Sequence, residues 1–333
     1  MTDRPTVLFA MAPEHLPRLF PPRLIERLAA LADVDGRFVA AGFDRPAAAA
    51  ALADTEILIT GWGCAPLDRR VLDAAPRLRA VLHAAGTIRG LITEACWERG
   101  LLVSSAAQAN AIPVAEYTLA AILFAGKDVF ALRESYRHAR IDAHAYPALG
   151  NYRRRVGVIG ASRVGRRLLE LLRPFDLATS VADPYLGPAE AAQFGAMLLP
   201  LDELLRGSDV VSLHAPDLPQ TRRMLDRRRL ALIPDGATLI NTSRGALVDP
   251  QALTEELLSG RINAVLDVTE PEPLPPDSPL HRLPNVVLTP HIAGSLGNEL
   301  ERLGGAVVAE VERLVGGLPL AHRVVRADLD RVA

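Results

Sequence analysis

Residues 156–165 read V-G-V-I-G-A-S-R-V-G, and the expected fold follows from this stretch. Val156–Ile159 is a short apolar run of the kind that forms a buried strand, and Gly160 ends it. An apolar-periodic stretch, R-R-L-L-E-L-L-R, follows and ends near Pro174, which predicts a helix. A strand, a tight turn and a helix are therefore expected. The start of such a helix offers backbone N–H groups and a positive dipole end, which favour a pyrophosphate.

The glycines of this turn match most of a dinucleotide-binding fingerprint. The full pattern is G-x-G-x-x-G, whereas this chain reads G-x-S-x-x-G, with Gly160, Ser162 and Gly165 at the three positions. The middle glycine normally lets the backbone approach the pyrophosphate closely, and the hydroxyl of the small Ser162 can donate to a phosphate instead. A purely structural turn is the alternative interpretation, because glycine-rich turns between strand and helix are common.

Asp183 adds a second feature of a dinucleotide site. It ends the predicted strand Thr179–Ala182 and lies 23 residues after Gly160. This is near the roughly 20-residue spacing of the acid that accepts hydrogen bonds from the adenosine ribose. An acid there repels a 2′-phosphate, so it favours NAD over NADP. The alternative is an ordinary aspartate before the turn residue Pro184.

The composition indicates a globular protein of two domains. At 333 residues, 49% hydrophobic and 23% charged, the chain is long enough for two cores. A formal net charge of −2 does not favour binding to nucleic acid. Two cysteines, Cys64 and Cys96, are too few for a disulfide framework and are expected to be reduced. The start has no signal-peptide layout and no apolar run reaches about 18 residues, so we expect a cytoplasmic protein without a membrane span. No metal is expected.

Strand and helix patterns alternate through the first hundred residues, which predicts a parallel sheet wrapped by helices. Two turns after predicted strands, residues 61–64 (G-W-G-C) and 84–87 (A-A-G-T), are candidate ligand turns, because open α/β sheets bind ligands at the carboxyl ends of their strands. Ordinary connecting turns are the alternative. The predicted strands are Val7–Ala10, Ile57–Thr60, Arg79–His83 and Leu101–Ser104, and the predicted helices are Leu24–Leu31, Ala47–Ala53 and Leu67–Ala75.

A long helical pattern runs from Ala111 to about Arg133. It is apolar on most faces, so we expect it to be buried and to cross between the domains. Residues 138–151 lack periodicity and are interpreted as a loop and as a candidate contact with a second chain. A second α/β block starts at Arg155, and an amphipathic helix over Asn298–Val315 precedes a tail expected to return to the first domain. The further strands predicted in the second block are Val210–His214, Thr238–Asn241, Ala264–Asp267 and Val286–Leu288, and its helices are Ala189–Phe194, Leu201–Arg206, Arg227–Ile233 and Pro250–Ser259.

Arg244, Asp267 and His291 each lie at or just past the end of a predicted strand, and Glu272 follows in the loop after Asp267. Because parallel strands end at one edge of a sheet, these groups are expected to gather beside the nucleotide site. An arginine presents a planar fork to a carboxylate, and a histidine transfers a proton to or from a carbonyl oxygen. A carboxylate bonded to the far ring nitrogen fixes the tautomer. Singly, each residue has an ordinary structural explanation, and His214 is interpreted as structural.

In order and spacing, these stretches resemble the D-isomer-specific 2-hydroxyacid dehydrogenases, a family that includes D-lactate, glyoxylate/hydroxypyruvate and 3-phosphoglycerate dehydrogenases. The resemblance covers about residues 110–295. It rests on A-N-A-I-P-V-A-E-Y-T at 109–118, V-G-V-I-G-A-S-R-V-G at 156–165, A-D-P at 182–184, D-V-V-S-L-H-A-P at 209–216, I-N-T-S-R-G at 240–245, L-D-V-T-E-P-E-P-L at 266–274 and T-P-H-I-A-G at 289–294.

The resemblance implies an α/β fold in which a Rossmann-type NAD domain, residues 109–297, is inserted into a flavodoxin-like substrate domain, residues 1–108 and 298–333. It implies NAD-dependent interconversion of a D-2-hydroxy acid and its 2-keto acid, with His291 as acid/base, Glu272 as its partner and Arg244 on the substrate. It also implies a homodimer formed through residues around 115–150. The cofactor contacts that it implies are Gly160, Ser162, Arg163, Val164 and Gly165 at the pyrophosphate, Asp183 at the ribose, Ala215, Pro216 and Thr221 along the adenosine side, Thr118, Thr242 and Asp267 near the nicotinamide, and Ser243 and Gly294 as further contacts.

The chain departs from the family pattern in three places. Ser162 replaces the middle glycine, which bears on cofactor affinity. The carboxylate-binding loop of the family reads G-x-G-V-D, whereas here it reads Gly86-Thr87-Ile88-Arg89-Gly90. Trp62 occupies the other expected substrate turn. We therefore expect substrate contacts from Trp62, Gly86, Thr87 and Arg89 and a substrate that is bulkier or more anionic than usual, with a solvent-facing Arg89 as the alternative.

The sequence also fits two other functions. The fold also suits a nucleotide-sensing binding protein, such as the transcriptional corepressors of the family. Formate dehydrogenases carry Gln at the position of Glu272 and are disfavoured, whereas phosphite dehydrogenase keeps the acid.

Overall fold

The computed structural model describes residues 4–138 and 149–330. The chain divides into two compact units, which we call unit 1 (Met1–Asn110 with Ser295–Ala333) and unit 2 (Ala111–Gly294). The expected domain boundaries, at 108–109 and 297–298, fall next to these. Each unit has its own sheet, so the expected α/β class with two parallel sheets is confirmed.

Unit 1 contains a six-stranded sheet in the order β13-β5-β4-β3-β1-β2. Five strands are parallel, and their order is the flavodoxin-like order 2-1-3-4-5. The strand order reverses between β1 and β3, which is the switch point where such sheets bind ligands. The strands are β1 (Thr6–Ala10), β2 (Asp33–Val39), β3 (Ile57–Thr60), β4 (Ala80–His83), β5 (Leu102–Ser105) and β13 (Arg323–Val324), and the helices are α1 (Leu16–Leu19), α2 (Pro22–Leu31), α3 (Pro46–Asp54), α4 (Arg69–Ala74), α5 (Glu94–Glu98) and α13 (Leu300–Val315).

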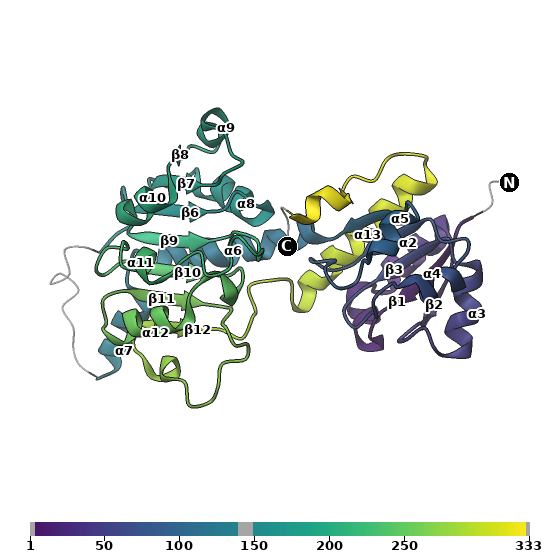
Figure 1. Cartoon of the computed structure of the whole chain (residues 1–333), viewed down its shortest axis with the longest axis horizontal. Coiled ribbons are helices and arrows are strands. Elements are labelled where there is room, and N and C mark those ends of the chain that lie inside the picture. The colour runs from purple at the N-terminus through teal and green to yellow at the C-terminus, as the bar shows by residue number, and fades with distance from the viewer. Residues whose placement is uncertain (1–3, 139–148, 331–333) are drawn as a thin grey trace. The chain divides into compact units, whose positions relative to one another are not determined.

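The central strands of unit 1, β1, β3 and β4, are apolar runs because both faces of the sheet are buried there. Val7 and Phe9 of β1 pack into one hydrophobic cluster, and the alternate residues Leu8 and Ala10 pack into another. The first cluster includes residues from α13, which lies next to α2 in Figure 1 (yellow and purple). The tail then pairs antiparallel with β5 through β13, so it returns to the first domain as expected.

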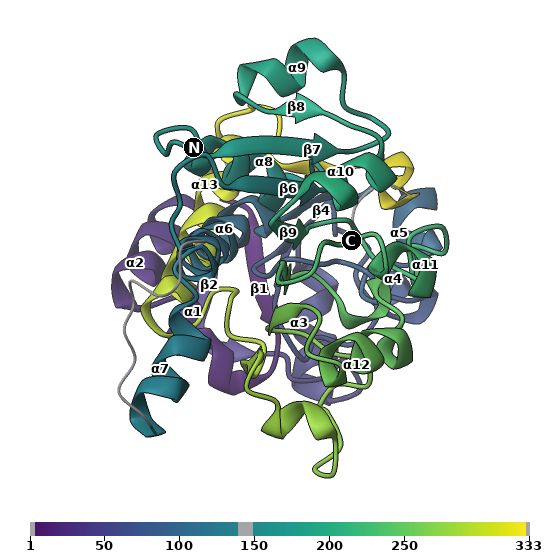
Figure 2. The same ribbon diagram turned by 90° about the vertical axis from the view of Figure 1, so that its left-hand side faces the viewer.

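Unit 2 contains a seven-stranded parallel sheet in the order β12-β11-β10-β9-β6-β7-β8. This is the Rossmann order 3-2-1-4-5-6 with a seventh strand, and its switch point lies between β6 and β9. Figure 2 shows α9 and β8 at one edge of this sheet, beside β7. The strands are β6 (Arg155–Ile159), β7 (Ala178–Ala182), β8 (Met197–Leu198), β9 (Val210–Leu213), β10 (Thr238–Asn241), β11 (Asn263–Leu266) and β12 (Val286–Leu288), and the helices are α6 (Ala107–Ala125, which begins in unit 1), α7 (Val129–His138), α8 (Arg163–Leu172), α9 (Pro188–Gln193), α10 (Leu201–Gly207), α11 (Arg227–Leu230) and α12 (Pro250–Leu258).

The helix after the fingerprint turn packs as its sequence predicts. Gly165, Leu168, Leu169 and Leu172 of α8 are buried, which is the i, i+3, i+4, i+7 pattern of one helix face. Its leucines join the strand residues Val156 and Val158 in one cluster. The turn at the start of α8 is therefore fixed by the core beneath it.

One long predicted helix is two helices, so the prediction of continuity from Ala111 to Arg133 is wrong. α6 ends at Ala125, and α7 starts at Val129. The N–H groups of Lys127 and Asp128 bond back to the carbonyls three residues earlier, and Asp128 adopts a φ of 49°. These contacts tighten the last turn and then turn the chain away. Most of the predicted loop 138–151 lies outside the described residues.

No single helix in the described ranges is long and apolar enough to cross a membrane, although α6 and α7, bent by 63° at their break, pass that test of length and composition as a pair.

Three short or partly covered edge strands were not predicted, β2, β8 and the two-residue β13. β2 reads D-V-D-G-R-F-V and alternates between half-buried and exposed residues, because an edge strand is only partly covered. It therefore lacks the continuous apolar run that marks the central strands. β8 has two residues and no period to detect.

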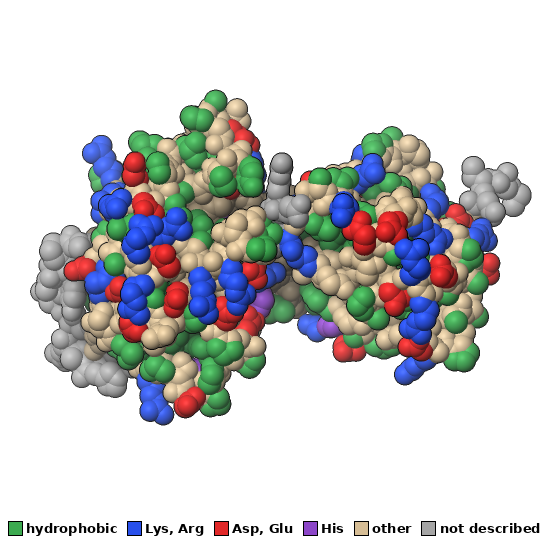
Figure 3. Space-filling model, in the orientation of Figure 1, with side chains coloured by type: hydrophobic (Ala, Val, Ile, Leu, Met, Phe, Trp, Pro, Cys, Tyr) green, Lys and Arg blue, Asp and Glu red, His purple; other side chains and the backbone are tan. Residues whose placement is uncertain are grey.

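Charged side chains of both signs are interspersed over the visible face of unit 2 (Figure 3). Many are ion pairs: Arg228 pairs with Asp202, and Arg227 pairs with Glu255. The arginines of α11 are therefore neutralised by neighbouring acids.

Candidate functional site

The fingerprint turn depends on its two outer glycines. Gly160 has a φ of 95°, and a Cβ atom there would lie 2.7 Å from the backbone nitrogen of Ala215 on the neighbouring strand end. A Cβ atom on Gly165 would collide with the carbonyl oxygen of Gly160. The first glycine thus allows the turn, and the last allows the helix to pack on the strand.

Ser162 takes the place of the middle glycine and caps the helix. Its hydroxyl oxygen accepts a hydrogen bond of 3.3 Å from the N–H of Gly165, and its backbone is extended. Since the oxygen is the acceptor, the hydroxyl proton can still be donated to a ligand. Arg163 and Val164 follow in the first turn of α8, where backbone N–H groups have no partner within the helix.

Asp183 is held at the end of β7 by two backbone groups. One carboxylate oxygen accepts from the N–H of Ala161 at 2.7 Å, and the other accepts from the N–H of Tyr185 at 2.7 Å. The acid is therefore fixed beside the fingerprint turn, as its spacing from Gly160 predicted.

Hydroxyl groups form hydrogen bonds within and between the loops that follow β9 and β10. Ser243 donates to the carbonyl of Ala215 at 2.8 Å, and Thr221 donates to the carbonyl of Pro216 at 2.5 Å. Thr242, next to Ser243, bonds to Thr118 of α6 at 2.9 Å. Five expected cofactor residues thus line one edge of the sheet, and Gly294 ends unit 2 beyond the β12 loop.

His291 and Glu272, which the family resemblance implies as acid/base and partner, lie in contact. The Nδ1 atom of His291 lies 2.6 Å from a carboxylate oxygen of Glu272, and the side chains are 50% and 42% exposed. An ionised carboxylate only accepts, so Nδ1 carries a proton and Nε2 of the neutral ring carries the lone pair. His291 has a φ of 54°, in the left-handed region that few residues other than glycine adopt.

Asp267 holds the loop that carries His291. It is 2% exposed, and its carboxylate accepts from the N–H groups of Ile292 (2.8 Å) and Ala293 (2.9 Å). The hydroxyl of Thr289 donates to it at 2.6 Å, and that same hydroxyl bonds to Tyr117 of α6 at 2.8 Å. A buried carboxylate is expensive unless it is satisfied, so these contacts stabilise one loop conformation.

Arg244 follows β10, the strand next to β11, so it shares an edge of the sheet with Asp267 and His291. Asn241 supports the turn by donating to the Arg244 carbonyl at 2.9 Å and accepting from the N–H of Ser243 at 3.0 Å. A Cβ atom on Gly245 would collide with the backbone of Thr269, so this glycine lets the arginine loop touch the loop of Glu272.

The candidate substrate turns of unit 1 follow β3 and β4. Trp62 is 38% exposed, and its ring lies 5.3 Å from that of His15. Gly86 is half-buried, and the hydroxyl oxygen of Thr87 accepts from the N–H of Arg89 at 3.2 Å. The Arg89 guanidinium donates to the carbonyl of Leu329 near the end of the described chain. The predicted contact between Arg89 and substrate stays a prediction, because the structure gives this side chain another partner.

His214 is buried behind the fingerprint turn, as the structural interpretation requires. Its Nε2 atom lies 2.7 Å from the hydroxyl of Ser212, and burial lowers its pKa to about 3. His83 is the corresponding residue in unit 1. It bonds to the hydroxyl of Thr60 at 2.9 Å, and burial lowers its pKa to about 4.

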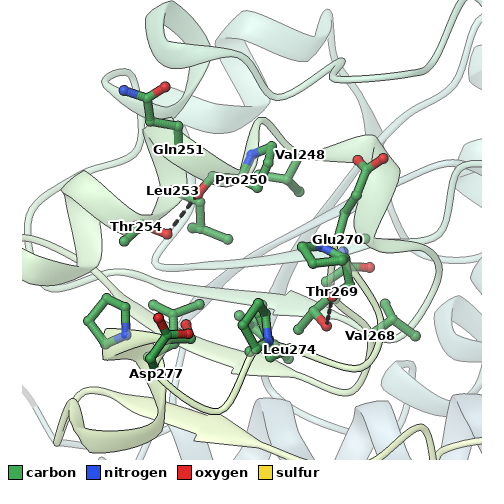
Figure 4. Close-up of a pocket in the computed structure, with 18 residues that line it drawn as sticks. Val248, Pro250, Gln251, Leu253, Thr254, Val268, Thr269, Glu270, Leu274 and Asp277 are labelled. Carbon is green, nitrogen blue, oxygen red and sulfur yellow. Dashed lines mark hydrogen bonds between the residues drawn. The ribbon is translucent and has the colours of Figure 1, made fainter.

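A cavity of about 400 Å³ lies between α12 and the loop after β11. In Figure 4, Gln251 and Thr254 of the helix lie opposite Thr269 and Leu274 of the loop. Glu270 borders it and is paired with Arg222. The three residues expected to act on substrate are not among its 18 lining residues.

The turn residues fit a dinucleotide. A helix start, a small capping hydroxyl and a fixed acid lie at the strand ends where Rossmann sheets bind one. Within residues 4–138 and 149–330, no group of three or more His, Cys, Asp or Glu side chains is arranged to hold a metal ion.

Tyr117 and Thr289 are site residues that the sequence analysis missed. Both carry hydroxyls, and both lie within motifs already quoted, V-A-E-Y-T and T-P-H. The signal that could have identified Tyr117 is its polar hydroxyl in a helix that is otherwise apolar.

The chain matches the family model described as "D-isomer specific 2-hydroxyacid dehydrogenase, NAD binding domain" over residues 119–293. It is 35% identical over 292 residues to the D-3-phosphoglycerate dehydrogenase of Mycobacterium tuberculosis. That alignment covers 87% of this chain and 55% of the relative, so the chain spans about half the length of the curated relatives it matches.

Two solved structures resemble it along nearly the whole chain. D-lactate dehydrogenase from Aquifex aeolicus, complexed with NAD and lactic acid, is 27% identical with a TM-score of 0.70, covering 94% of this chain and 96% of that one. A phosphoglycerate oxidoreductase from Rhizobium etli has a TM-score of 0.82 at 24% identity, covering 98% and 100%, which shows the shared fold. The chain therefore belongs to the D-isomer-specific 2-hydroxyacid dehydrogenase family, and its unit 2 carries the NAD-binding domain of that family.

Proposed function

We propose that the protein interconverts a D-2-hydroxy acid and its 2-keto acid with NAD as the redox partner. The observation that carries the proposal is the His291–Glu272 pair, at 2.6 Å, on the same sheet edge as Arg244 and the fingerprint turn. When bound, NAD supplies the hydride donor or acceptor. Side chains of the protein bind the substrate and transfer the proton.

His291 moves the proton. Its Nε2 atom takes the hydroxyl proton during oxidation and returns a proton to the carbonyl oxygen during reduction. Glu272 keeps the ring in the required tautomer through Nδ1 and stabilises the imidazolium that forms.

Arg244 binds the carboxylate of the substrate. Its guanidinium offers two parallel donors, which orient the neighbouring carbonyl as well as holding the charge. The Asn241 contacts and the glycine after Arg244 stabilise the turn that presents it. The turns of Trp62, Gly86 and Thr87 in unit 1 are proposed to add substrate contacts, with the Trp62 ring favouring a bulky side chain.

NAD is the proposed cofactor rather than NADP. The Asp183 carboxylate is held at the end of β7 by two backbone N–H groups, next to the fingerprint turn. A 2′-phosphate would meet this charge at short range.

A homodimer is also proposed. Phe124, Tyr136 and Tyr152 are 48%, 68% and 72% exposed on and after the α6–α7 pair, and exposed aromatic residues are typical of interfaces. Light scattering of wild type and Tyr136→Glu tests this: a dimer that weakens in the variant is expected, and a wild-type monomer contradicts it.

NADH oxidation with a panel of 2-keto acids, from glyoxylate and pyruvate to phenylpyruvate, tests the activity. Wild type should turn over at least one member, and His291→Ala should lose roughly 100-fold or more in kcat. His281→Ala, an exposed histidine of the same unit, is the control. Tight NADH binding without turnover of any keto acid would contradict the proposal and favour a nucleotide-sensing protein; phosphite oxidation would favour the other alternative.

A further inference from the structure

Tyr117 and Thr118, adjacent residues of α6, each bond to a different loop of the proposed site. Tyr117 reaches Thr289, two residues before His291, and Thr118 reaches Thr242, two residues before Arg244. The two contacts therefore connect one helix to the proton-transfer loop and to the carboxylate-binding loop.

The direction of the first contact follows from the chemistry of Asp267. Its ionised carboxylate only accepts, so the hydroxyl proton of Thr289 points to it across 2.6 Å. The oxygen of Thr289 must then accept at its other contact, and Tyr117 is the donor across 2.8 Å. The result is a chain of two donated hydrogen bonds from Tyr117 through Thr289 to Asp267.

Tyr117 is suited to being a permanent donor. Burial raises the pKa of its phenol, and the nearby charge of Asp267 raises it further, although the bond with Thr289 lowers it. The phenol therefore keeps its proton at any pH near neutrality.

The second contact has a fixed direction as well. The hydroxyl of Thr118 donates to the carbonyl of Val114 at 2.7 Å. Its oxygen must therefore accept from Thr242 across 2.9 Å. Thr118 is fully buried and Thr242 is 8% exposed, so water does not replace a lost partner.

We propose that Tyr117 and Thr118 are positioning residues with separate duties, Tyr117 for the imidazole of His291 and Thr118 for the guanidinium of Arg244. The inference rests on the proposed function, because it assigns these two groups their roles. His291 has a left-handed backbone, and its N–H donates to the carbonyls of Asp267 and Thr289 at 3.0 Å each. A shift of Thr289 or Asp267 would thus move the imidazole directly.

The experiment compares the two neighbours by steady-state kinetics with the best keto acid of the panel. Tyr117→Phe keeps the ring and removes the donor, so kcat should fall about 5-fold with KM within about 2-fold. Thr118→Val keeps the shape and removes the hydroxyl, so KM should rise about 5-fold with kcat within about 2-fold. Thr289→Ser and Thr118→Ser keep the hydroxyls and should stay within about 2-fold of wild type, whereas Thr289→Val should match or exceed the loss of Tyr117→Phe.

A second measurement needs neither cofactor nor activity. In protein labelled with ¹⁵N-histidine, the ring signals of His291, assigned by their absence in His291→Asn, should shift in Tyr117→Phe and stay in place in Thr118→Val. Equal losses of kcat and KM in both variants, serine variants as impaired as the valine ones, or unmoved His291 signals in Tyr117→Phe would overturn the inference. If wild type turns over no keto acid, the proposed function fails, and the ring signals still decide the role of Tyr117.

Discussion

The two sheets share an architecture and differ at the edge where ligands bind. Both are parallel, both have a switch point, and each buries a histidine beside a hydroxyl at the end of a central strand. In unit 2 the loops at this edge are tied down by side chains, among them Asp183, Asn241 and Asp267. In unit 1 the turn of Trp62 is held mainly by backbone bonds, such as that from Ala12 to the Trp62 carbonyl.

Under the proposed function, this difference assigns proton transfer to the anchored loops of unit 2 and substrate recognition to the turns of unit 1. Proton transfer and hydride chemistry need groups fixed to within a fraction of an ångström, and side-chain anchors provide that. A turn held by backbone bonds tolerates exchange of its side chains. Under the proposed function, exchange of side chains in the unit 1 turns should alter substrate preference and leave proton transfer by unit 2 unchanged, and the following variants probe that division.

Glycine replacement should give the largest contrast. Gly165→Ala places a methyl group against the carbonyl of Gly160, so we expect a loss of about 3 kcal/mol in stability. Gly86→Ala meets only the side-chain nitrogen of Asn110, at 3.6 Å, and should cost less than about 0.5 kcal/mol. Differential scanning calorimetry measures both, and equal melting temperatures would contradict the comparison.

Arginine replacement compares the two candidate anion-binding groups. Arg244→Lys removes the planar fork and should lower kcat/KM roughly 100-fold, about 2.7 kcal/mol. Arg89→Lys keeps the positive charge and disturbs the contact with Leu329, so kcat/KM should change less than about 2-fold if the guanidinium serves the tail. A large loss in Arg89→Lys, with selectivity changed, would support its predicted contact with substrate instead.

Acid should destabilise both units through their buried histidines. The pKa of His83 is lowered to about 4 from 6.5, so the unfolded chain binds more protons and stability falls between about pH 6.5 and pH 4. From pH 7 to pH 5 the loss should be about 2 kcal/mol. Trp62 and Trp97, the two tryptophans of the chain, both lie in unit 1, so urea unfolding followed by their fluorescence reports that unit.

Variants of the two buried histidines test which of them controls the pH dependence of unit 1. His83→Gln should flatten the pH dependence seen by fluorescence, and His214→Gln should leave it as in wild type. A wild-type fluorescence midpoint that does not move between pH 7 and pH 5 would show that burial of His83 does not control the acid sensitivity of unit 1.

Replacement of Asp183 should change the preference between NADH and NADPH, with a smaller effect than the changes described above. Asp183→Ser keeps a short acceptor for the N–H of Ala161 and removes the charge, so NADH should bind about 10-fold more weakly while NADPH binding improves. Fluorescence titration of both nucleotides measures the ratio, with Asp217→Ser as a control in the same unit. Equal weakening of both nucleotides would argue against a role in discrimination.

Replacement of Trp62 should have the smallest effect on kcat/KM, and this effect should depend most on the size of the substrate. Trp62→Ala should lower kcat/KM about 5-fold for a bulky keto acid and leave glyoxylate within about 2-fold, because only a large side chain loses contact area. The ratio of the two values is the measurement. A uniform change for both substrates would assign Trp62 to the stability of the turn.

Much of unit 2 could be predicted from sequence because its signals are local. Buried strands are continuous apolar runs, and a residue just after a parallel strand must lie at the binding edge. That rule placed Arg244, Asp267 and His291 at one edge, whereas the pairing of Glu272 with His291 was expected from the resemblance to the family. The contacts that escaped prediction join residues far apart in the chain: 172 positions separate Tyr117 from Thr289, and 240 separate Arg89 from Leu329. Such partners are chosen by packing, which no local pattern encodes.

The membership of α13 in unit 1 has a consequence for how the chain is made. Leu303 and Val308 of this helix complete the hydrophobic cluster under β1, and Gly304 lies against the carbonyl of Leu19. The first 110 residues therefore leave the ribosome without one wall of their core. Unit 2 is continuous, so it can finish folding during synthesis while unit 1 waits, with apolar surface open to chaperones, for a segment made after the whole of its neighbour.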